Sequence, residues 1–136
     1  VREVGHYSCR SMTGNCAALQ SLADEPGRVQ MNPADAQRLG IADKQLVWVS
    51  SRRGKVISRA DLSDRINPGA VYMTYQWWVG ACNELTQDNL DPISKTPETK
   101  YCAVKVEAIA DQQWAERYAW MAYSDMKARL KAAADV

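Results

Sequence analysis

Polar and aromatic side chains of the kinds that bind a nucleotide-bearing anion are concentrated in three loop-like parts of the sequence. Arginine and lysine neutralise phosphates, asparagine reads a base edge or a sugar hydroxyl, and aromatic rings flank a planar heterocycle. The residues are Arg2, His6, Tyr7, Ser8 and Arg10 in the opening segment, Tyr75, Gln76, Trp77 and Trp78 at the end of a predicted strand, and Asn83, Glu84, Thr86, Asn89, Lys95, Lys100 and Tyr101 further on. Their types favour a binding site for such an anion, although core rings and surface cations would give the same composition.

Catalysis by these residues alone is not expected. His6 is the only histidine, and the sequence has no Gly-x-Ser-x-Gly, His-Glu-x-x-His or P-loop motif. The four cysteines, Cys9, Cys16, Cys82 and Cys102, show no Cys-x-x-Cys spacing, so no local motif provides a zinc site or iron–sulfur ligands. The residue types therefore predict binding without a reactive centre in this chain.

The bulk composition is that of a soluble globular domain. The 136 residues are enough to bury one core, and 17 basic against 16 acidic residues give a net charge of +1. This near balance argues against a general nucleic-acid binder, which usually carries a basic excess. No apolar run approaches the roughly 20 residues that span a bilayer, so we expect no membrane insertion. A disulfide among the four cysteines is possible but not needed for a core of this size, so we expect reduced thiols in a cytoplasmic protein. The sequence begins at Val1 without an initiator methionine, and we expect it to be part of a longer chain.

The elements that must position these side chains are mainly short strands. Alternating side chains predict strands at residues 28–31, 45–51, 55–62, 70–75 and 102–109, the second and third joined as a hairpin through Arg52-Arg53-Gly54. Asn32 as N-cap, Pro33 at the first helical position and Gly40 as the stop predict a helix of about two turns. Five or so short strands with two or three helices predict a small closed barrel, because closure removes the exposed edges of a short-stranded sheet.

Three further segments complete the predicted organisation. A short helix is expected near residues 15–23, and a longer helical tail from Asp111 is expected to pack through a stripe that starts at Trp114. Residues 77–100 are polar and marked by prolines, which predicts a long loop that is either functional or disordered.

Five sequence motifs in one order resemble the dinucleotide-binding domain of the molybdopterin oxidoreductases. They are Asn32-Pro33-x-Asp35-Ala36-x-x-Leu39-Gly40-Ile41-x-Asp43, Val47-x-Val49-x-Ser51-Arg52-Arg53-Gly54-x-Val56, Pro68-Gly69-x-Val71-Tyr72-Met73, Asn83-Glu84-Leu85-Thr86 followed by Asp91-Pro92-x-Ser94-Lys95-x-Pro97, and Lys100-x-Cys102-Ala103-Val104-Lys105-Val106-Glu107. Residues 2–16 and 73–78 narrow the resemblance to formate dehydrogenases of the formate–hydrogen lyase type.

The resemblance implies a mainly β fold with flanking helices. The expected architecture is a double-psi β-barrel of the aspartate-decarboxylase-like kind over residues 1–110, with a C-terminal helix over residues 111–136 packed on it. The resemblance also implies a bis-(molybdopterin guanine dinucleotide) cofactor that carries molybdenum. The implied cofactor-binding residues are Arg2, Glu3, His6, Tyr7, Ser8, Tyr75, Asn83 and Lys100. Ser8 departs from the nitrate reductases, which have a second histidine there, and this puts that single contact in doubt.

The implied parent enzyme oxidises formate to carbon dioxide and passes two electrons to an iron–sulfur cluster held outside this chain. Its metal-ligating selenocysteine or cysteine falls elsewhere in the parent, so the isolated domain is not expected to be catalytic. The implied partners are the remaining domains of the parent and electron-transfer or hydrogenase subunits. Two alternatives stay open: the same domain in a nitrate reductase or another molybdopterin oxidoreductase, and a non-catalytic double-psi barrel binding module. A self-processing decarboxylase is disfavoured, because it needs a Gly-Ser cleavage pair and no glycine here precedes a serine.

Overall fold

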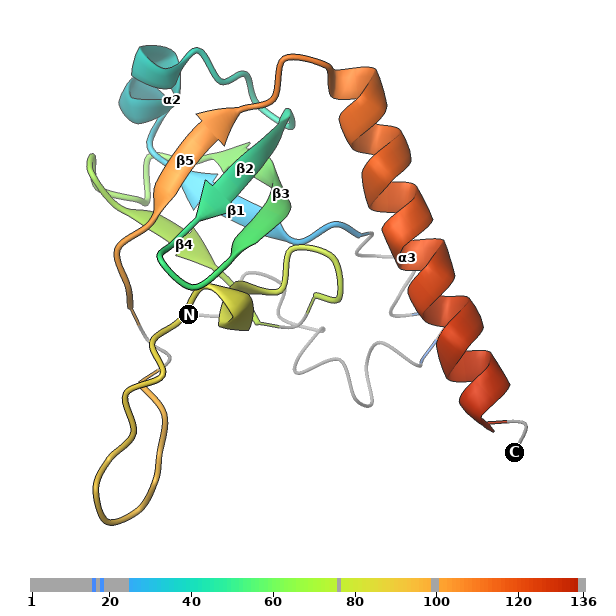
Figure 1. The fold of residues 1–136 in the computed structure, drawn as a ribbon. Helices are drawn as coiled ribbons and strands as arrows, with labels where there is room; N and C mark the ends of the chain where they lie inside the picture. The colour runs from blue at the N-terminus through green and yellow to red at the C-terminus, as the bar shows by residue number, and fades with distance from the viewer. Residues whose placement is uncertain (1–15, 17, 19–24, 76, 99–100, 135–136) are drawn as a thin grey trace.

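A curved sheet of five short strands forms the centre of the computed structural model (Figure 1), which describes residues 16, 18, 25–75, 77–98 and 101–134. The elements along the chain are β1 (Arg28–Met31), α2 (Pro33–Leu39), β2 (Leu46–Ser50), β3 (Lys55–Leu62), β4 (Val71–Met73), the 3-10 helix η2 (Cys82–Glu84), β5 (Lys105–Ala108) and α3 (Gln112–Ala134). The strand order across the sheet is β4-β1-β3-β2-β5. The expected helix near residues 15–23 lies almost wholly outside the described residues.

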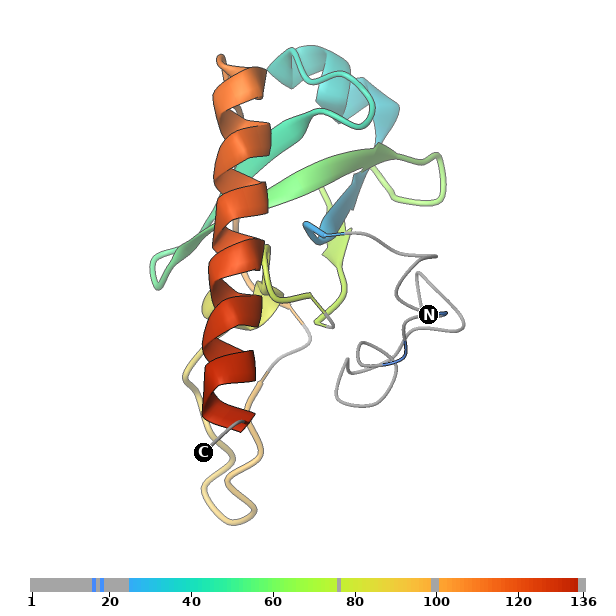
Figure 2. The same ribbon diagram turned by 90° about the vertical axis from the view of Figure 1, so that its right-hand side faces the viewer.

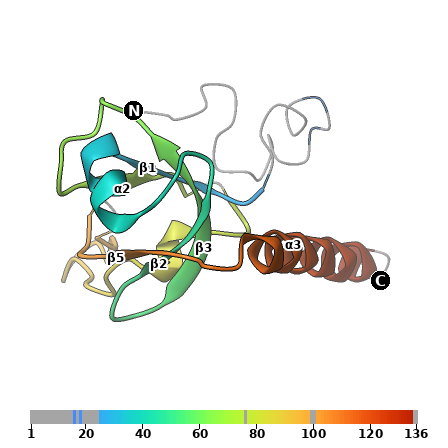
Figure 3. The ribbon, with the colours of Figure 1, turned by 90° about the horizontal axis from the view of Figure 1, so that it is seen from above.

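The sheet curls into a half-barrel. β1 and β3 run parallel, whereas the β1–β4, β2–β3 and β2–β5 pairs are antiparallel. Viewed from above, β1 and β5 lie on opposite sides of the curl and β3 lies at its bend (Figure 3). The mainly β fold with flanking helices is therefore confirmed. The closed barrel is not: within the described residues, the outer edges of β4 and β5 pair with no other strand.

Both faces of the sheet are buried, which explains why its strands are so apolar. The concave face carries the first core cluster, which includes Val47 and Val49 of β2. The convex face carries the second, in which Leu46 and Ile57 pack against α3. The predicted alternation along β2 is thus confirmed. Full burial of each such aliphatic side chain stabilises the fold by about 1.5–3 kcal/mol.

Helix α2 begins and ends where its capping residues predict. The Asn32 side chain accepts a hydrogen bond from the Ala34 N–H (2.9 Å), which satisfies a free donor of the first turn. Gly40 ends the helix in the left-handed region (φ 67°), a conformation that other residues adopt only with strain. The buried Asp35 side chain accepts from the Gly69 N–H (2.6 Å), so α2 also holds the turn before β4.

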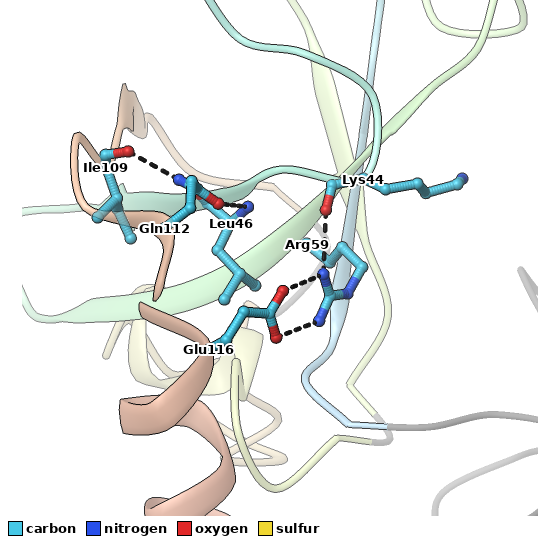
Figure 4. Close-up of polar contacts among 6 residues, drawn as sticks. All are labelled: Lys44, Leu46, Arg59, Ile109, Gln112 and Glu116. Carbon is cyan, nitrogen blue, oxygen red and sulfur yellow. Dashed lines mark hydrogen bonds and ion pairs between the residues drawn. The ribbon is translucent and has the colours of Figure 1, made fainter. Parts of the chain in front are cut away.

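Helix α3 is fixed to the sheet at its first turn (Figure 4). The Gln112 side chain accepts from Leu46 N–H (2.8 Å) and donates to Leu46 O (2.9 Å) and Ile109 O (2.7 Å). Arg59 donates to both carboxylate oxygens of Glu116, at 2.7 and 3.0 Å. From there the helix lies along one side of the sheet and runs past it (Figure 2). No described helix is both long and apolar enough to cross a membrane.

Three strands are shorter than predicted: β2 by one residue at each end, and β4 and β5 by more, for local reasons. β4 ends at Met73 because Thr74 turns away to accept a hydrogen bond from the Trp77 indole. β5 begins at Lys105, which pairs with Ser50, the last residue of β2, so residues 102–104 have no partner strand there.

Candidate functional site

Two of the eight predicted cofactor-binding residues, Tyr75 and Asn83, lie in the described part of the chain. The other six lie outside it: Arg2, Glu3, His6, Tyr7, Ser8 and Lys100. Tyr75 follows β4, and Asn83 lies in η2. Both belong to the segment that leaves the end of the sheet opposite α2 (Figures 1 and 2).

Asn83 presents an exposed amide on a short, well-held turn. Its backbone carbonyl accepts a hydrogen bond from the Thr86 hydroxyl (3.1 Å), and its Oδ1 lies 4.0 Å from the Cys82 sulfur. Among the described residues, its amide nitrogen has no hydrogen-bond acceptor. A side-chain amide in this state offers both a donor and an acceptor to a bound molecule.

The turn between β2 and β3 anchors η2. Arg53 donates from Nε (3.1 Å) and Nη2 (2.9 Å) to the carbonyl of Leu85, and the Leu85 side chain is buried in the concave core. Gly54 allows the close approach of η2, since a Cβ there would lie 2.6 Å from the Glu84 carbonyl oxygen. The position of Asn83 is therefore set by a hairpin about 30 residues earlier in the sequence.

Tyr75 lies on the outside of a turn whose inner side is packed. Its side chain is 62% exposed, whereas Thr74 and Trp77 on either side of it are buried. The Trp77 indole donates to the Thr74 hydroxyl (2.8 Å), and its ring occupies the space beside Gly27, where a Cβ would lie 2.6 Å from the ring. Trp77 is thus a packing residue and not an exposed binding residue.

The residues after Trp77 are held against the start of β1. The Glu25 carboxylate accepts from the backbone N–H groups of Trp78 (3.3 Å) and Val79 (3.0 Å). Gly27 donates its N–H to the carbonyl of Val79 (2.7 Å). Gly80 then packs on β3 with φ 82°, and a Cβ there would lie 2.6 Å from the carbonyl oxygen of Ile57. These contacts hold the backbone that follows Tyr75 against β1 and β3.

Residues 86–98 form an exposed arm that projects from the sheet beyond η2 (Figure 1). One bridge, Leu90 with Pro97, joins its two sides. At its tip, Asp91 Oδ1 accepts from Ile93 N–H (3.0 Å) and Ser94 N–H (2.6 Å). These hydrogen bonds, with one from the Ser94 hydroxyl, hold the pKa of Asp91 below its ordinary value. The polar loop predicted from sequence is therefore an ordered turn over much of its length.

Sequence reasoning did not predict the residues that support the site: Glu25, Arg53 and Gly54. The sequence did indicate that Arg53 and Gly54 lie in a hairpin turn, because they stand between two segments of alternating side chains. Nothing in the local sequence, however, indicates that this turn contacts Leu85. Within the described ranges no three His, Cys, Asp or Glu side chains form a group that could hold a metal ion.

Residues 1–103 match the family described as Molydopterin dinucleotide binding domain. The chain belongs to this family. It is 69% identical over 134 residues to Formate dehydrogenase H of Escherichia coli (strain K12), a match that covers 98% of this chain and 19% of that protein. It is 42% identical over 108 residues to F420-dependent formate dehydrogenase 2 subunit alpha of Methanococcus maripaludis, with 79% of this chain and 16% of the relative covered. The domain thus spans less than a fifth of the length of these relatives.

The fold of the domain is also similar to part of acetylene hydratase from Pelobacter acetylenicus. The TM-score is 0.54 at 17% sequence identity, and the likeness covers 61% of this chain and 14% of that one. At this identity the likeness concerns the fold alone.

Proposed function

We propose that this chain is the molybdopterin guanine dinucleotide-binding domain of a molybdenum formate dehydrogenase. The observation that carries the proposal is the family match over residues 1–103, together with 69% identity to Formate dehydrogenase H over 98% of the chain. The parent enzyme would oxidise formate to carbon dioxide and release two electrons. It would also hold an iron–sulfur cluster outside this domain.

The described residues fit such a cofactor. Asn83 offers an exposed amide donor and acceptor from a turn anchored by Arg53, and Tyr75 offers an exposed ring on a packed frame. A dinucleotide presents hydrogen-bonding groups and planar rings of the kind that these side chains bind. We propose that both contact the cofactor, together with Arg2, Glu3, His6, Tyr7, Ser8 and Lys100.

The contribution of this domain is positioning. The bound group supplies the molybdenum centre that exchanges two electrons with the substrate. Asn83 would offer its amide to a polar group of the dinucleotide from a turn that Arg53 anchors at Leu85. The exposed Tyr75 ring would pack beside a planar ring of the cofactor. Small displacements of a reacting group reduce rates strongly, so rigid support of these two side chains is part of the function.

We propose further that the half-barrel belongs to a double-psi β-barrel over residues 1–110, on which the helix of residues 111–136 packs. In support of closure, a hollow of about 590 Å³ lies beside Val71 of β4 and Val106 of β5, the two strands with unpaired outer edges. Apolar side chains such as Met31 and Val104 also line it. A strand added there by the parent chain would satisfy both edges.

The proposed partners are the remaining domains of the parent chain and electron-transfer or hydrogenase subunits. Relatives about five times longer than the chain support the first of these, since this domain aligns with only 19% of Formate dehydrogenase H. We also propose a cytoplasmic location for the assembled enzyme.

A substrate assay on the parent enzyme tests the proposal. We expect formate to reduce an artificial electron-acceptor dye in the presence of the parent, and nitrate not to reoxidise a reduced dye. Nitrate-dependent oxidation without formate activity would assign the domain to a nitrate reductase. Absence of both activities in protein with bound cofactor would assign it to another molybdopterin oxidoreductase.

A further inference from the structure

Two cysteines from separate segments line one small hollow at the base of the arm. Cys82 begins η2, and Cys102 lies three residues before β5. Both are free thiols and half-buried, and both border a hollow of about 130 Å³ together with Met73 and Leu85. Neither cysteine has been given a part in cofactor binding.

The charge of one thiol acts on the other. Burial is the main cause that raises the pKa of Cys82, to about 11, and the negative charge of ionised Cys102 adds to the rise. Cys82 is consequently protonated at neutral pH. The geometric evidence that the two thiols lie near each other is the small hollow that both of them line.

The two cysteines bracket the arm. Cys82 is fixed because Arg53 anchors the end of η2 at Leu85, and the chain after Cys102 is fixed where β5 pairs with β2. A covalent bond between the two sulfurs would therefore close the arm into a loop at a base whose two sides are already held.

We propose that Cys82 and Cys102 form a dithiol site that small disulfide oxidants convert to an intramolecular disulfide. The Cys102 thiolate attacks the oxidant, breaks its S–S bond and releases one small thiolate. Cys82 then loses its proton and attacks the Cys102 sulfur of the mixed disulfide, which releases the second small thiolate. The two cysteines lose two electrons and two protons, and the oxidant becomes two thiols. This site does not depend on which cofactor the domain binds.

The test is peptide mapping by mass spectrometry of the reduced parent enzyme after treatment with glutathione disulfide. We expect a cross-linked peptide pair containing Cys82 and Cys102, two hydrogens lighter than the separate peptides. Closure should be at least several-fold faster at alkaline than at neutral pH, since more Cys82 is then ionised. Cys16, which is free and exposed in this chain, should take up glutathione in every sample and so serve as the control for equal oxidant.

Single variants identify the order of the steps. In Cys82→Ser the reaction should stop with glutathione attached to Cys102, and in Cys102→Ser the half-buried, protonated Cys82 should stay largely unmodified. Whether the Cys82–Cys102 disulfide forms is decided by the wild-type protein, even if a variant folds poorly. Glutathione retained on Cys102 beside a free Cys82, or a disulfide from Cys82 to any other cysteine, would overturn the proposal.

Discussion

Asn83 is the predicted cofactor-binding residue whose surroundings are most fully defined. Its amide is exposed, whereas its backbone is held through Thr86 and the neighbouring turn. We predict that Asn83→Ala in the parent enzyme weakens cofactor retention by roughly 1 kcal/mol, several-fold in dissociation rate, because one hydrogen-bonding group is lost. The measurement is molybdenum content after gel filtration.

Asn67→Ala is the matched control, because Asn67 is also exposed but lies in the turn before β4, at the α2 end of the sheet. It should retain molybdenum as the wild type does. Equal retention in Asn83→Ala and the control would remove Asn83 from the proposed site.

Glu116 provides a pH prediction at the start of α3. Hydrogen bonds from Arg59, and then its positive charge, hold the pKa of Glu116 below its ordinary value of 4.5. A carboxylate with a lowered folded-state pKa contributes stability above its unfolded pKa and loses it as the pH falls through the folded value. The half-exposed pair should contribute only about 0.5 kcal/mol after solvent screening.

The measurement is amide hydrogen exchange in α3 of the parent enzyme as the pH is lowered through this acid range. Protection of the first turn should decrease in the wild type relative to Glu116→Gln, which has no carboxylate to titrate. An identical pH dependence in both proteins would show that the ion pair does not stabilise α3.

Among the elements, the hairpin turn between β2 and β3 packs directly against η2. Any Cβ at position 54 would lie 2.6 Å from the Glu84 carbonyl oxygen, and this backbone atom cannot yield as a flexible side chain would. We predict that Gly54→Ala displaces η2, destabilises the domain by about 1–3 kcal/mol and lowers molybdenum retention.

Gly40→Ala is a suitable comparison, since a Cβ there meets nothing within 4 Å although φ is 67°. It should reduce thermal stability but leave molybdenum retention in the folded enzyme unchanged. If both variants retain the cofactor equally, support of η2 is not required for binding.

The Gln112 side chain links the first turn of α3 to strand β2 through hydrogen bonds. Its side chain makes three hydrogen bonds, and without it the N–H of the fully buried Leu46 would lose this acceptor. We predict that Gln112→Ala costs about 1–3 kcal/mol, seen as faster hydrogen exchange in α3. Gln113→Ala, next to it on the exposed side, should have little effect; equal effects would mean that helix propensity dominates.

Local signals predicted the elements that local interactions determine. The cap at Asn32 and the stop at Gly40 gave both ends of α2, and alternation gave the β2–β3 hairpin. The ends of β4 and β5 depend instead on contacts made after folding, the Thr74–Trp77 hydrogen bond and the length of β2. Such contacts leave no periodic trace in the sequence, so both strands were predicted too long.

At the scale of the whole molecule, the family was predicted correctly because several motifs occur in one order. The structure explains one residue in each of two motifs. Gly54 allows the close approach of η2, and Asp91 accepts the hydrogen bonds that form the turn at the tip of the arm. The candidate site was predicted only as a set of side chains. Its support by Arg53 and Glu25 links segments 32 and about 54 residues apart, a separation that residue types alone cannot reveal.

The half-barrel also bears on where the cofactor binds. β4 and β5 present unpaired edges in the described chain, and the relatives extend well beyond it. We therefore propose that the cofactor binds to the assembled parent, in which other parts of the longer chain would complete the pocket.

The measurement that tests the central claim most directly is the ratio of guanine nucleotide to molybdenum released by acid from the intact parent enzyme. Cells able to make the cofactor must supply the protein. The account predicts about two guanine nucleotides for each molybdenum, as the proposed bis-(molybdopterin guanine dinucleotide) requires. Protein from such cells that contains neither molybdenum nor guanine nucleotide would contradict it, and the domain would then share the family's fold without its cofactor.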